Sequence, residues 1–137
     1  MHRLIVVAAV PAACLVLATA AFAAVIRGDS GPDVLRGTGA ADQMYGLGGA
    51  DRLTGRGGSD TMYGNSGADR LSGGTGSDTL YGGSGADRLT GGSGSDRFSG
   101  GSGSDRIYAR DGRRDVIDCG SGNDSAQTDA VDFVRSC

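Results

Sequence analysis

The sequence predicts an all-β protein, a parallel solenoid of nine-residue units in which two units make one coil. Three observations support this prediction. An Asp recurs every nine residues without interruption from Asp33 to Asp105, a large apolar residue follows each Asp two positions later, and Gly-rich segments lie between. Internal repeats of this kind are the signature of solenoids, and a chain of 137 residues has room for one such domain.

The repeating unit has the pattern G-G-x-G-x-D-x-U-x, where U is a large apolar residue. Four consecutive units match it in full over residues 73–108. Earlier units match it more loosely, because Leu47, Arg56 and Asn65 take the second Gly position and Ala40 takes the fourth. Glycine permits positive φ and close approach of neighbouring backbones, so these positions predict tight turns. The remaining segment, x-U-x, is long enough for only a very short strand.

A second period of eighteen residues lies over the first. The segments ADRLT (50–54), ADRLS (68–72) and ADRLT (86–90) alternate with SDTMY (59–63) and SDTLY (77–81). Two units therefore form one coil, with two short strands and two turns. Each strand stacks on the strand eighteen residues away, which gives two parallel sheets with the U side chains pointing inward.

Stacked coils bring Asp residues together. Neighbouring strands lie about 4.8 Å apart, and carboxylates at that spacing repel each other by about 1–3 kcal/mol per pair. One large apolar side chain per unit is a small core, so the coils need another source of stability. Calcium bonds to oxygen at about 2.3–2.6 Å, so one ion midway between two stacked Asp side chains reaches both, and turn carbonyls complete its ligands. Magnesium fits less well because it demands a tighter octahedron and retains its water.

The unit resembles the RTX (hemolysin-type) calcium-binding nonapeptide, and the resemblance covers about residues 28–108. It implies a right-handed parallel β-roll in which an Asp of one unit and the Asp two units further on share a calcium ion with turn carbonyls. Carried onto this chain, it gives two columns of metal ligands: Asp33, Asp51, Asp69, Asp87 and Asp105 in one, and Asp42, Asp60, Asp78 and Asp96 in the other. The gaps between stacked Asp residues allow at most about seven internal calcium sites. The sites nearest the N-terminus are expected to be the weakest, since Ala40 replaces a Gly and Pro32 precedes Asp33.

Residues 1–23 are expected to be a secretory signal peptide. Arg3 gives a basic start, an apolar run extends from Leu4 to Leu17, and Ala21-Phe22-Ala23 is a small-residue exit. A membrane anchor is the alternative, but the run is short for a bilayer span, and Cys14 lies inside it rather than at its end, as a lipidated Cys would. We therefore expect a secreted, extracellular protein without a stable membrane span. This leader departs from the C-terminal export signal that the resemblance implies.

The expected loss of the leader decides which cysteines remain in the mature chain. Cys14 leaves with the leader, so Cys119 and Cys137 remain as an even pair in an exported chain, and we expect them to form a disulfide. The nonapeptide register slips after Ile107, so residues 24–108 are expected to form the roll and residues 109–137 a cap.

The apolar cover of the cap is expected from Ile117, Val131, Phe133 and Val134. The acidic residues of the cap are either ion ligands or solvated loop residues, and the sequence leaves both interpretations open. They are Asp115, Asp118, Asp124, Asp129 and Asp132.

The residues that flank each U face outward and form two columns, one of arginines and one of tyrosines beside Thr61 and Thr79: Arg52, Arg70, Arg88 and Arg106, and Tyr45, Tyr63 and Tyr81. Either these columns stack between coils and help the strands pair, or they form a binding face for an acidic or sugar polymer. Residues 24–137 hold 16 Asp and 12 Arg, a net charge of about −4. Filling seven sites would bring that charge to about +10, so calcium would convert an acidic chain into a cationic surface.

The expected function is calcium binding coupled to folding, without catalysis. Residues 24–137 contain no His, Glu or Lys, and their carboxylates recur in like environments rather than as one pair of unlike groups. The alternative is an extracellular adhesion or glycan-binding module that uses the outer Arg and Tyr columns, with an acidic polysaccharide or another cell-surface polymer as partner. Nucleic acid is not expected as a partner of an exported acidic chain.

Overall fold

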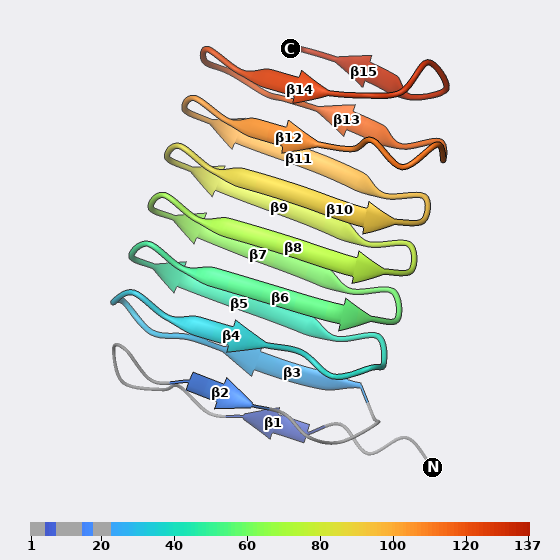
Figure 1. Cartoon of the computed structure of the whole chain (residues 1–137). Coiled ribbons are helices and arrows are strands. Elements are labelled where there is room, and N and C mark those ends of the chain that lie inside the picture. The colour runs from blue at the N-terminus through green and yellow to red at the C-terminus, as the bar shows by residue number, and fades with distance from the viewer. Residues whose placement is uncertain (1–4, 8–14, 18–22) are drawn as a thin grey trace.

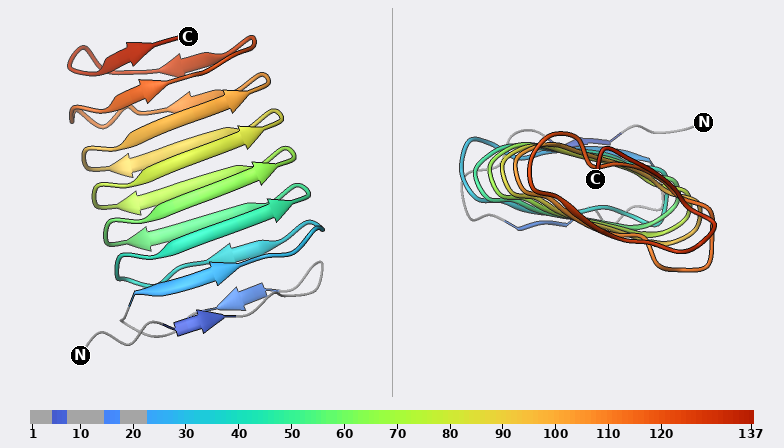
Figure 2. Two further views of the ribbon diagram at one scale, coloured as in Figure 1. Left: turned by 180° about the vertical axis from the view of Figure 1, so that it is seen from behind. Right: turned by 90° about the horizontal axis from the view of Figure 1, so that it is seen from above.

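The computed structural model describes residues 5–7, 15–17 and 23–137, and these form strands joined by turns (Figure 1). The strands wind into a flattened solenoid, and the view along its axis shows the coils superposed as one elongated ring (Figure 2). The predicted fold, an all-β parallel solenoid with two units per coil, is confirmed. Within the described part of the chain, no helix is long and apolar enough to cross a bilayer.

Odd-numbered and even-numbered strands form two separate parallel sheets. The eight-stranded sheet contains, in spatial order, β1 (Ile5–Val7), β3 (Ala24–Arg27), β5 (Gln43–Gly48), β7 (Thr61–Ser66), β9 (Thr79–Ser84), β11 (Arg97–Ser102), β13 (Val116–Asp118) and β15 (Phe133–Arg135). The seven-stranded sheet contains β2 (Leu15–Leu17), β4 (Val34–Arg36), β6 (Arg52–Gly57), β8 (Arg70–Thr75), β10 (Arg88–Ser93), β12 (Arg106–Tyr108) and β14 (Ser125–Gln127).

The sheet register repeats the sequence period. In the central coils each residue pairs with the residue eighteen positions on, as Leu53 does with Leu71. The slip after Ile107 lengthens one coil, so that Arg97 pairs with Val116, and the next coil is shorter, so that Val116 pairs with Phe133. Residues 109–137 therefore add β13, β14 and β15 to the two sheets.

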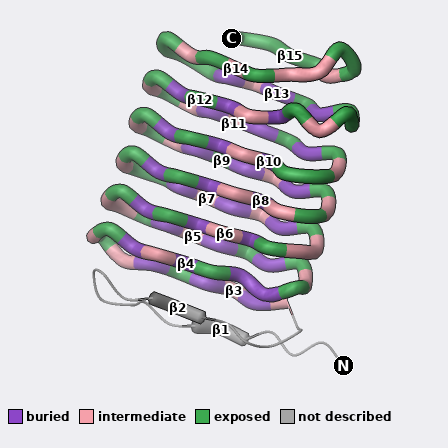
Figure 3. The backbone as a smooth tube through the Cα atoms, viewed as in Figure 1, coloured by how far each residue is buried: buried purple, intermediate pink, exposed green. Residues whose placement is uncertain are grey.

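The U side chains form the core, as predicted. Buried residues alternate with exposed ones along every central coil (Figure 3). Each of these core side chains is at most 3% exposed: Ile26, Leu35, Met44, Leu53, Met62, Leu71, Leu80, Leu89, Phe98, Ile107 and Ile117. The expected cover of the last coil is only partly present, because Val131, Phe133 and Val134 are 40–59% exposed. Phe133 and Val134 belong to β15, which lies at the edge of its sheet among the described residues.

The strands of the central coils are longer than the sequence predicted. Those from β5 to β11 have six residues each, because the pairing continues past x-U-x into the Gly positions, as between Gly74 and Gly92. A side chain at Gly92 would collide with the carbonyl group of Gly74, so the close stacking of these segments depends on glycine.

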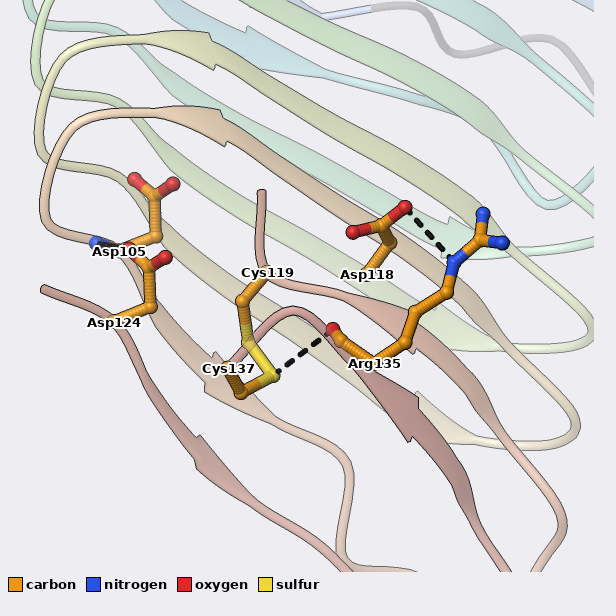
Figure 4. The surroundings of a disulfide bond; sticks show 6 residues. All are labelled: Asp105, Asp118, Cys119, Asp124, Arg135 and Cys137. Carbon is orange, nitrogen blue, oxygen red and sulfur yellow. Dashed lines mark hydrogen bonds and ion pairs between the residues drawn. A yellow bond between two sulfur atoms is a disulfide. The ribbon is translucent and has the colours of Figure 1, made fainter. Parts of the chain in front are cut away.

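The predicted disulfide between Cys119 and Cys137 is present and ties the C-terminus to β13 (Figure 4). The two Cα atoms are 5.0 Å apart, and Cys119 is buried. The backbone N–H of Cys119 also donates to the carbonyl of Arg135 at 3.2 Å. The last strand is therefore held covalently as well as by backbone hydrogen bonds.

The signal peptide stays a prediction. Cys14 and most of residues 1–23 lie outside the described residues. Two short pieces of that segment, β1 and β2, pair with β3 and β4.

Three non-Gly residues adopt positive φ at the second Gly position: Leu47 (79°), Arg56 (90°) and Asn65 (72°). A left-handed backbone conformation costs residues other than Gly and Asn about 1–2 kcal/mol. Substitution by Gly removes this cost, but the greater flexibility of Gly in the unfolded state cancels part of the gain in stability. We expect Leu47→Gly and Arg56→Gly each to raise the free energy of unfolding in saturating calcium by about 0.5–1 kcal/mol, measured by denaturant unfolding. Asn65→Gly should gain less. Leu47→Ala is the control, since it removes the side chain but keeps the strain; an equal gain there would contradict the explanation.

Candidate metal centres

Each Gly-rich turn ends in a buried Asp that directly precedes a strand. The nine predicted metal ligands are all 1–2% exposed: Asp33, Asp42, Asp51, Asp60, Asp69, Asp78, Asp87, Asp96 and Asp105. Since residues eighteen apart occupy neighbouring coils, these Asp residues lie in two columns, one at the start of each sheet's strands. The structure therefore brings the predicted residues together in the predicted arrangement.

One carboxylate oxygen of each of these Asp residues except Asp33 accepts a backbone N–H from the preceding coil and so joins neighbouring coils. The backbone N–H of Asp51 donates to Oδ1 of Asp69 at 2.8 Å, and the N–H of Asp69 donates in turn to Oδ1 of Asp87 at 2.8 Å. The other column is built in the same way, with the N–H of Asp60 bonded to Oδ1 of Asp78 at 2.8 Å. These hydrogen bonds fix the orientation of every carboxylate in the columns except that of Asp33, whose Oδ1 is buried without a partner.

The second carboxylate oxygen of most of these residues is buried and has no hydrogen-bond partner. Eight Oδ2 atoms share this property: those of Asp51, Asp60, Asp69, Asp78, Asp87, Asp96, Asp105 and Asp115. Buried polar atoms in proteins are almost always paired, because an unpaired one loses its hydration without compensation. Eight repeated exceptions in two columns indicate positions suited to an ion.

Glycine backbone borders each of these unpaired oxygens except that of Asp115. A Cβ atom built on Gly82, five residues before Asp87, would lie 2.5 Å from Oδ2 of Asp87 and 2.5 Å from the carbonyl oxygen of Gly100 in the next coil. At Gly64 the corresponding distances, to Oδ2 of Asp69 and to the carbonyl oxygen of Gly82, are 2.5 and 2.6 Å. Only Gly keeps this space free of a side chain. Carboxylate and carbonyl oxygens together are the donor set that hard cations such as Ca²⁺ prefer.

The first two turns differ from the later ones. Oδ2 of Asp33 accepts the N–H of Asp29 at 2.7 Å, and Oδ2 of Asp42 accepts the N–H of Thr38 at 2.6 Å and its hydroxyl at 3.0 Å. Neither Asp29 nor Thr38 has positive φ, whereas the corresponding residue of the next turn, Leu47, does. Positive φ at this position accompanies the loss of the N–H donor to Oδ2. The second Gly of the unit therefore leaves that oxygen free for another partner.

Burial raises the pKa values of the eight carboxyl groups that carry an unpaired Oδ2. Desolvation is the largest cause, the hydrogen bond from the preceding Asp N–H opposes it, and the charges of neighbouring Asp residues add to it for several groups. The pKa is raised to about 7 for Asp60 and to about 6 for Asp51, Asp87, Asp96 and Asp115. Ionised columns are therefore costly unless a cation lies beside them.

The columns continue past the predicted ligands. Asp115 is buried and accepts the N–H of Asp96 on Oδ1 at 2.7 Å, and Asp124 accepts the N–H of Asp105 at 2.8 Å (Figure 4). Asp132 accepts the N–H of Asp115 at 3.0 Å. The sequence does not decide the role of Asp115: Asp115-Val116-Ile117 has the D-x-U pattern, but its spacing of ten from Asp105 breaks the period of nine.

The other two acids that the sequence left open lie outside the columns. Asp118 forms an ion pair with Arg135, with 3.0 Å between its Oδ2 and Nε. Asp129 accepts the backbone N–H of Asp111 at 2.8 Å.

No point in the described residues gathers three or more His, Cys, Asp or Glu side chains. An ion at the columns would therefore need ligands besides the carboxylates, and the backbone carbonyl groups beside the glycines are available for this.

Comparison with known families agrees with this geometry. The description "RTX calcium-binding nonapeptide repeat (4 copies)" matches residues 27–62, 63–98 and 90–126. The chain belongs to this RTX family. All eight unpaired Oδ2 atoms lie within the matched residues. The RTX roll is a structural calcium-binding fold, and membership implies calcium as the bound ion. Neither a curated protein nor a solved structure was found to match the chain.

Proposed function

We propose that this RTX chain is a secreted calcium-binding protein whose roll folds when Ca²⁺ binds between successive coils. The observation that carries the proposal is the repeated buried Oδ2 atom without a partner, bordered by glycine carbonyls. A divalent cation there would give each oxygen a partner and would remove the repulsion within each column. Its role is structural, since it holds neighbouring coils together.

The proposed ligands are the nine predicted Asp residues together with Asp115. Eight of these ten supply an unpaired Oδ2 atom. At Oδ2 of Asp33 and of Asp42 a cation competes with the N–H groups of Asp29 and Thr38. Asp33 keeps an unpaired Oδ1, whereas both oxygens of Asp42 accept hydrogen bonds, so Asp42 is the weakest member. Turn carbonyls, including that of Gly100, complete the coordination.

Secretion is proposed from the chain's chemistry. The disulfide between Cys119 and Cys137 is a bond that persists in oxidising compartments, and RTX repeats are typical of secreted proteins. Residues 1–23 would be the leader, residues 24–108 the ion-binding roll, and residues 109–137 the cap, closed by the disulfide.

The test is a calcium titration followed by far-UV circular dichroism at pH 7.5, with magnesium as the control ion. We expect the strand signal to be weak in chelator and to appear with calcium, because ligand binding and folding are coupled. Magnesium at the same concentration should produce much less. A strand signal that is already complete in chelator would contradict the proposed coupling.

The outer tyrosine column has a structural role. The rings of Tyr45 and Tyr63 are stacked at 5.0 Å between centroids, those of Tyr63 and Tyr81 at 4.8 Å, and the guanidinium of Arg27 covers the free face of Tyr45 at 4.8 Å. Most ring faces are therefore already in contact with a neighbour, which leaves mainly ring edges for a sugar. These contacts support cross-coil stacking as the role of the tyrosines, and the arginine column is the stronger candidate for a binding face.

A further inference from the structure

We propose that the arginine ladder of the seven-stranded sheet binds an acidic polysaccharide, meaning a polymer with carboxylate or sulfate groups on successive sugars. The ladder is defined as Arg52, Arg70, Arg88 and Arg106. The proposal rests on the proposed calcium binding, because the columns behind the ladder are acidic until ions fill them.

A groove follows the ladder across the coils. Its volume is about 740 Å³, and besides the ladder it is lined by small residues of the turns, among them Ala50, Ala68, Ala86 and Ser104, and by the four Asp residues that precede the ladder arginines. A second groove of about 450 Å³ lies along the ladder residues, where Thr54, Ser72 and Thr90 contribute hydroxyl groups. Guanidinium groups and hydroxyl groups thus line one continuous strip that runs along the solenoid axis.

The ladder arginines are exposed and lack anionic partners. Among residues 23–137 the one ion pair joins Arg135 to Asp118, away from the ladder. Strand pairing puts Arg52, Arg70, Arg88 and Arg106 in direct register, so neighbouring residues are about 4.8 Å apart. The like charges repel each other, and a chain of anions would relieve that repulsion. Guanidinium also binds carboxylate and sulfate groups through two parallel hydrogen bonds.

The positive strip occurs on one sheet only. At the equivalent positions the other sheet carries Gln43, Thr61 and Thr79 before Arg97. Its corresponding groove is smaller, about 410 Å³, and contains two arginines, Arg97 and Arg114. Three ADR segments and the SDR segment at 104–106 therefore place four arginines in line on one face, which suits a linear polymer lying along the axis.

The lining favours a sugar polymer over nucleic acid. Proteins that bind single-stranded nucleic acid combine basic residues with aromatic rings on which bases stack. The aromatic residue of this sheet beside the ladder is Tyr108, and the guanidinium of Arg88 already lies over its ring at 4.6 Å. Hydroxyl and guanidinium donors without a free aromatic platform match the hydroxyl and acidic groups of a polysaccharide.

Calcium would control the binding. Asp51, Asp69, Asp87 and Asp105 lie buried next to the four ladder residues, so without ions an equal number of negative charges offsets the arginines. Divalent ions on these carboxylates would leave the strip with a positive potential. Binding is therefore expected in calcium and weak in chelator.

The experiment measures retention and affinity of the full chain on immobilised heparin, at fixed ionic strength, in calcium and in chelator. Uncharged dextran serves as the control polymer. The double variant Arg52→Gln/Arg70→Gln is expected to lose at least about tenfold in heparin affinity, since it removes two charge-assisted contacts. The matched control, Arg97→Gln/Arg114→Gln, makes the same change in net charge in the groove of the other sheet and should lose less than about twofold.

Each outcome has a defined meaning. Equal losses in the two double variants would show attraction by net charge alone and would overturn the proposal, as would no loss in the ladder variant. A single-stranded oligonucleotide that binds as tightly as heparin and depends on the same arginines would replace the polysaccharide with nucleic acid. Arginine-dependent binding that is unchanged in chelator would overturn the calcium control. Calcium-dependent circular dichroism, followed on the same samples, separates these failures from a failure of the proposed function, because none of the variants alters an Asp column.

Discussion

Asp69→Asn is expected to stabilise the calcium-free roll at pH 7 and, at the same time, to weaken its response to calcium. The Asn carbonyl can still accept the N–H of Asp51, as Oδ1 of Asp69 does at 2.8 Å. The amide NH₂ would replace the unpaired Oδ2 beside the carbonyl oxygen of Gly82 and could donate to it. One buried charge is lost and one unpaired acceptor is satisfied, so we expect a gain of about 1–3 kcal/mol in chelator.

In calcium the same substitution removes a charged ligand from the middle of a column. The affinity of the ions beside it should fall by about tenfold or more, since calcium sites are tuned by the number of charged ligands. Thermal unfolding in chelator and in saturating calcium measures the first effect, and calorimetric titration measures the loss of affinity or stoichiometry.

Asp118→Asn is the matched control for Asp69→Asn. Asp118 lies outside the columns and pairs with Arg135 at the surface, and exposed ion pairs contribute little to stability. The control should change the melting temperature little in either condition. A decrease in stability in chelator for Asp69→Asn, together with an unchanged calcium response, would contradict the assignment of Oδ2 as an ion ligand.

The fold was predictable because the period and the geometry agree. Eighteen residues separate identical segments, and a coil of that length puts Leu53 on Leu71 and Asp51 next to Asp69 without any further information. The two columns of carboxylates follow directly from that register. The buried U positions follow from alternation along each strand.

Features that depend on backbone detail were not predictable. The strands extend into Gly positions such as Gly74, where composition carries no strand signal. Which carboxylate oxygen stays free depends on φ at the second position of the unit. Thr38 and Leu47 both replace Gly there, yet only Leu47 has positive φ. Asp115 was left open for a different reason, since one inserted residue hid its place in the column.

The calcium-free chain is expected to gain strand structure when the pH falls from about 7.5 to about 4. Burial raises the pKa of Asp60 to about 7 and the pKa values of Asp51, Asp87, Asp96 and Asp115 to about 6, whereas an Asp of the unfolded chain titrates near 3.9. Between these values the folded state binds more protons than the unfolded state. Stability is therefore complete below about pH 4 and is lost as the pH rises through 6 to 7.

The size of this effect follows from the number of groups. One pKa unit corresponds to about 1.4 kcal/mol. The pKa values of five carboxyl groups are raised by at least about two units each. Even after discounting for solvent screening, their summed effect is comparable with the whole stability of a small domain, about 5–15 kcal/mol. Far-UV circular dichroism in calcium-depleted buffer at a series of pH values measures it, with an expected midpoint near 6.

Saturating calcium should reverse the trend, because calcium binds only the ionised carboxylates and protons compete with it. The increase in melting temperature that calcium produces is then largest at pH 7.5 and shrinks as the pH falls below about 6. Protons and calcium are thus two ways of removing the same buried negative charge. If the calcium-free chain instead lost strand signal between pH 7.5 and 4, the carboxylates would have partners other than cations, and the proposed reason for calcium-dependent folding would be wrong.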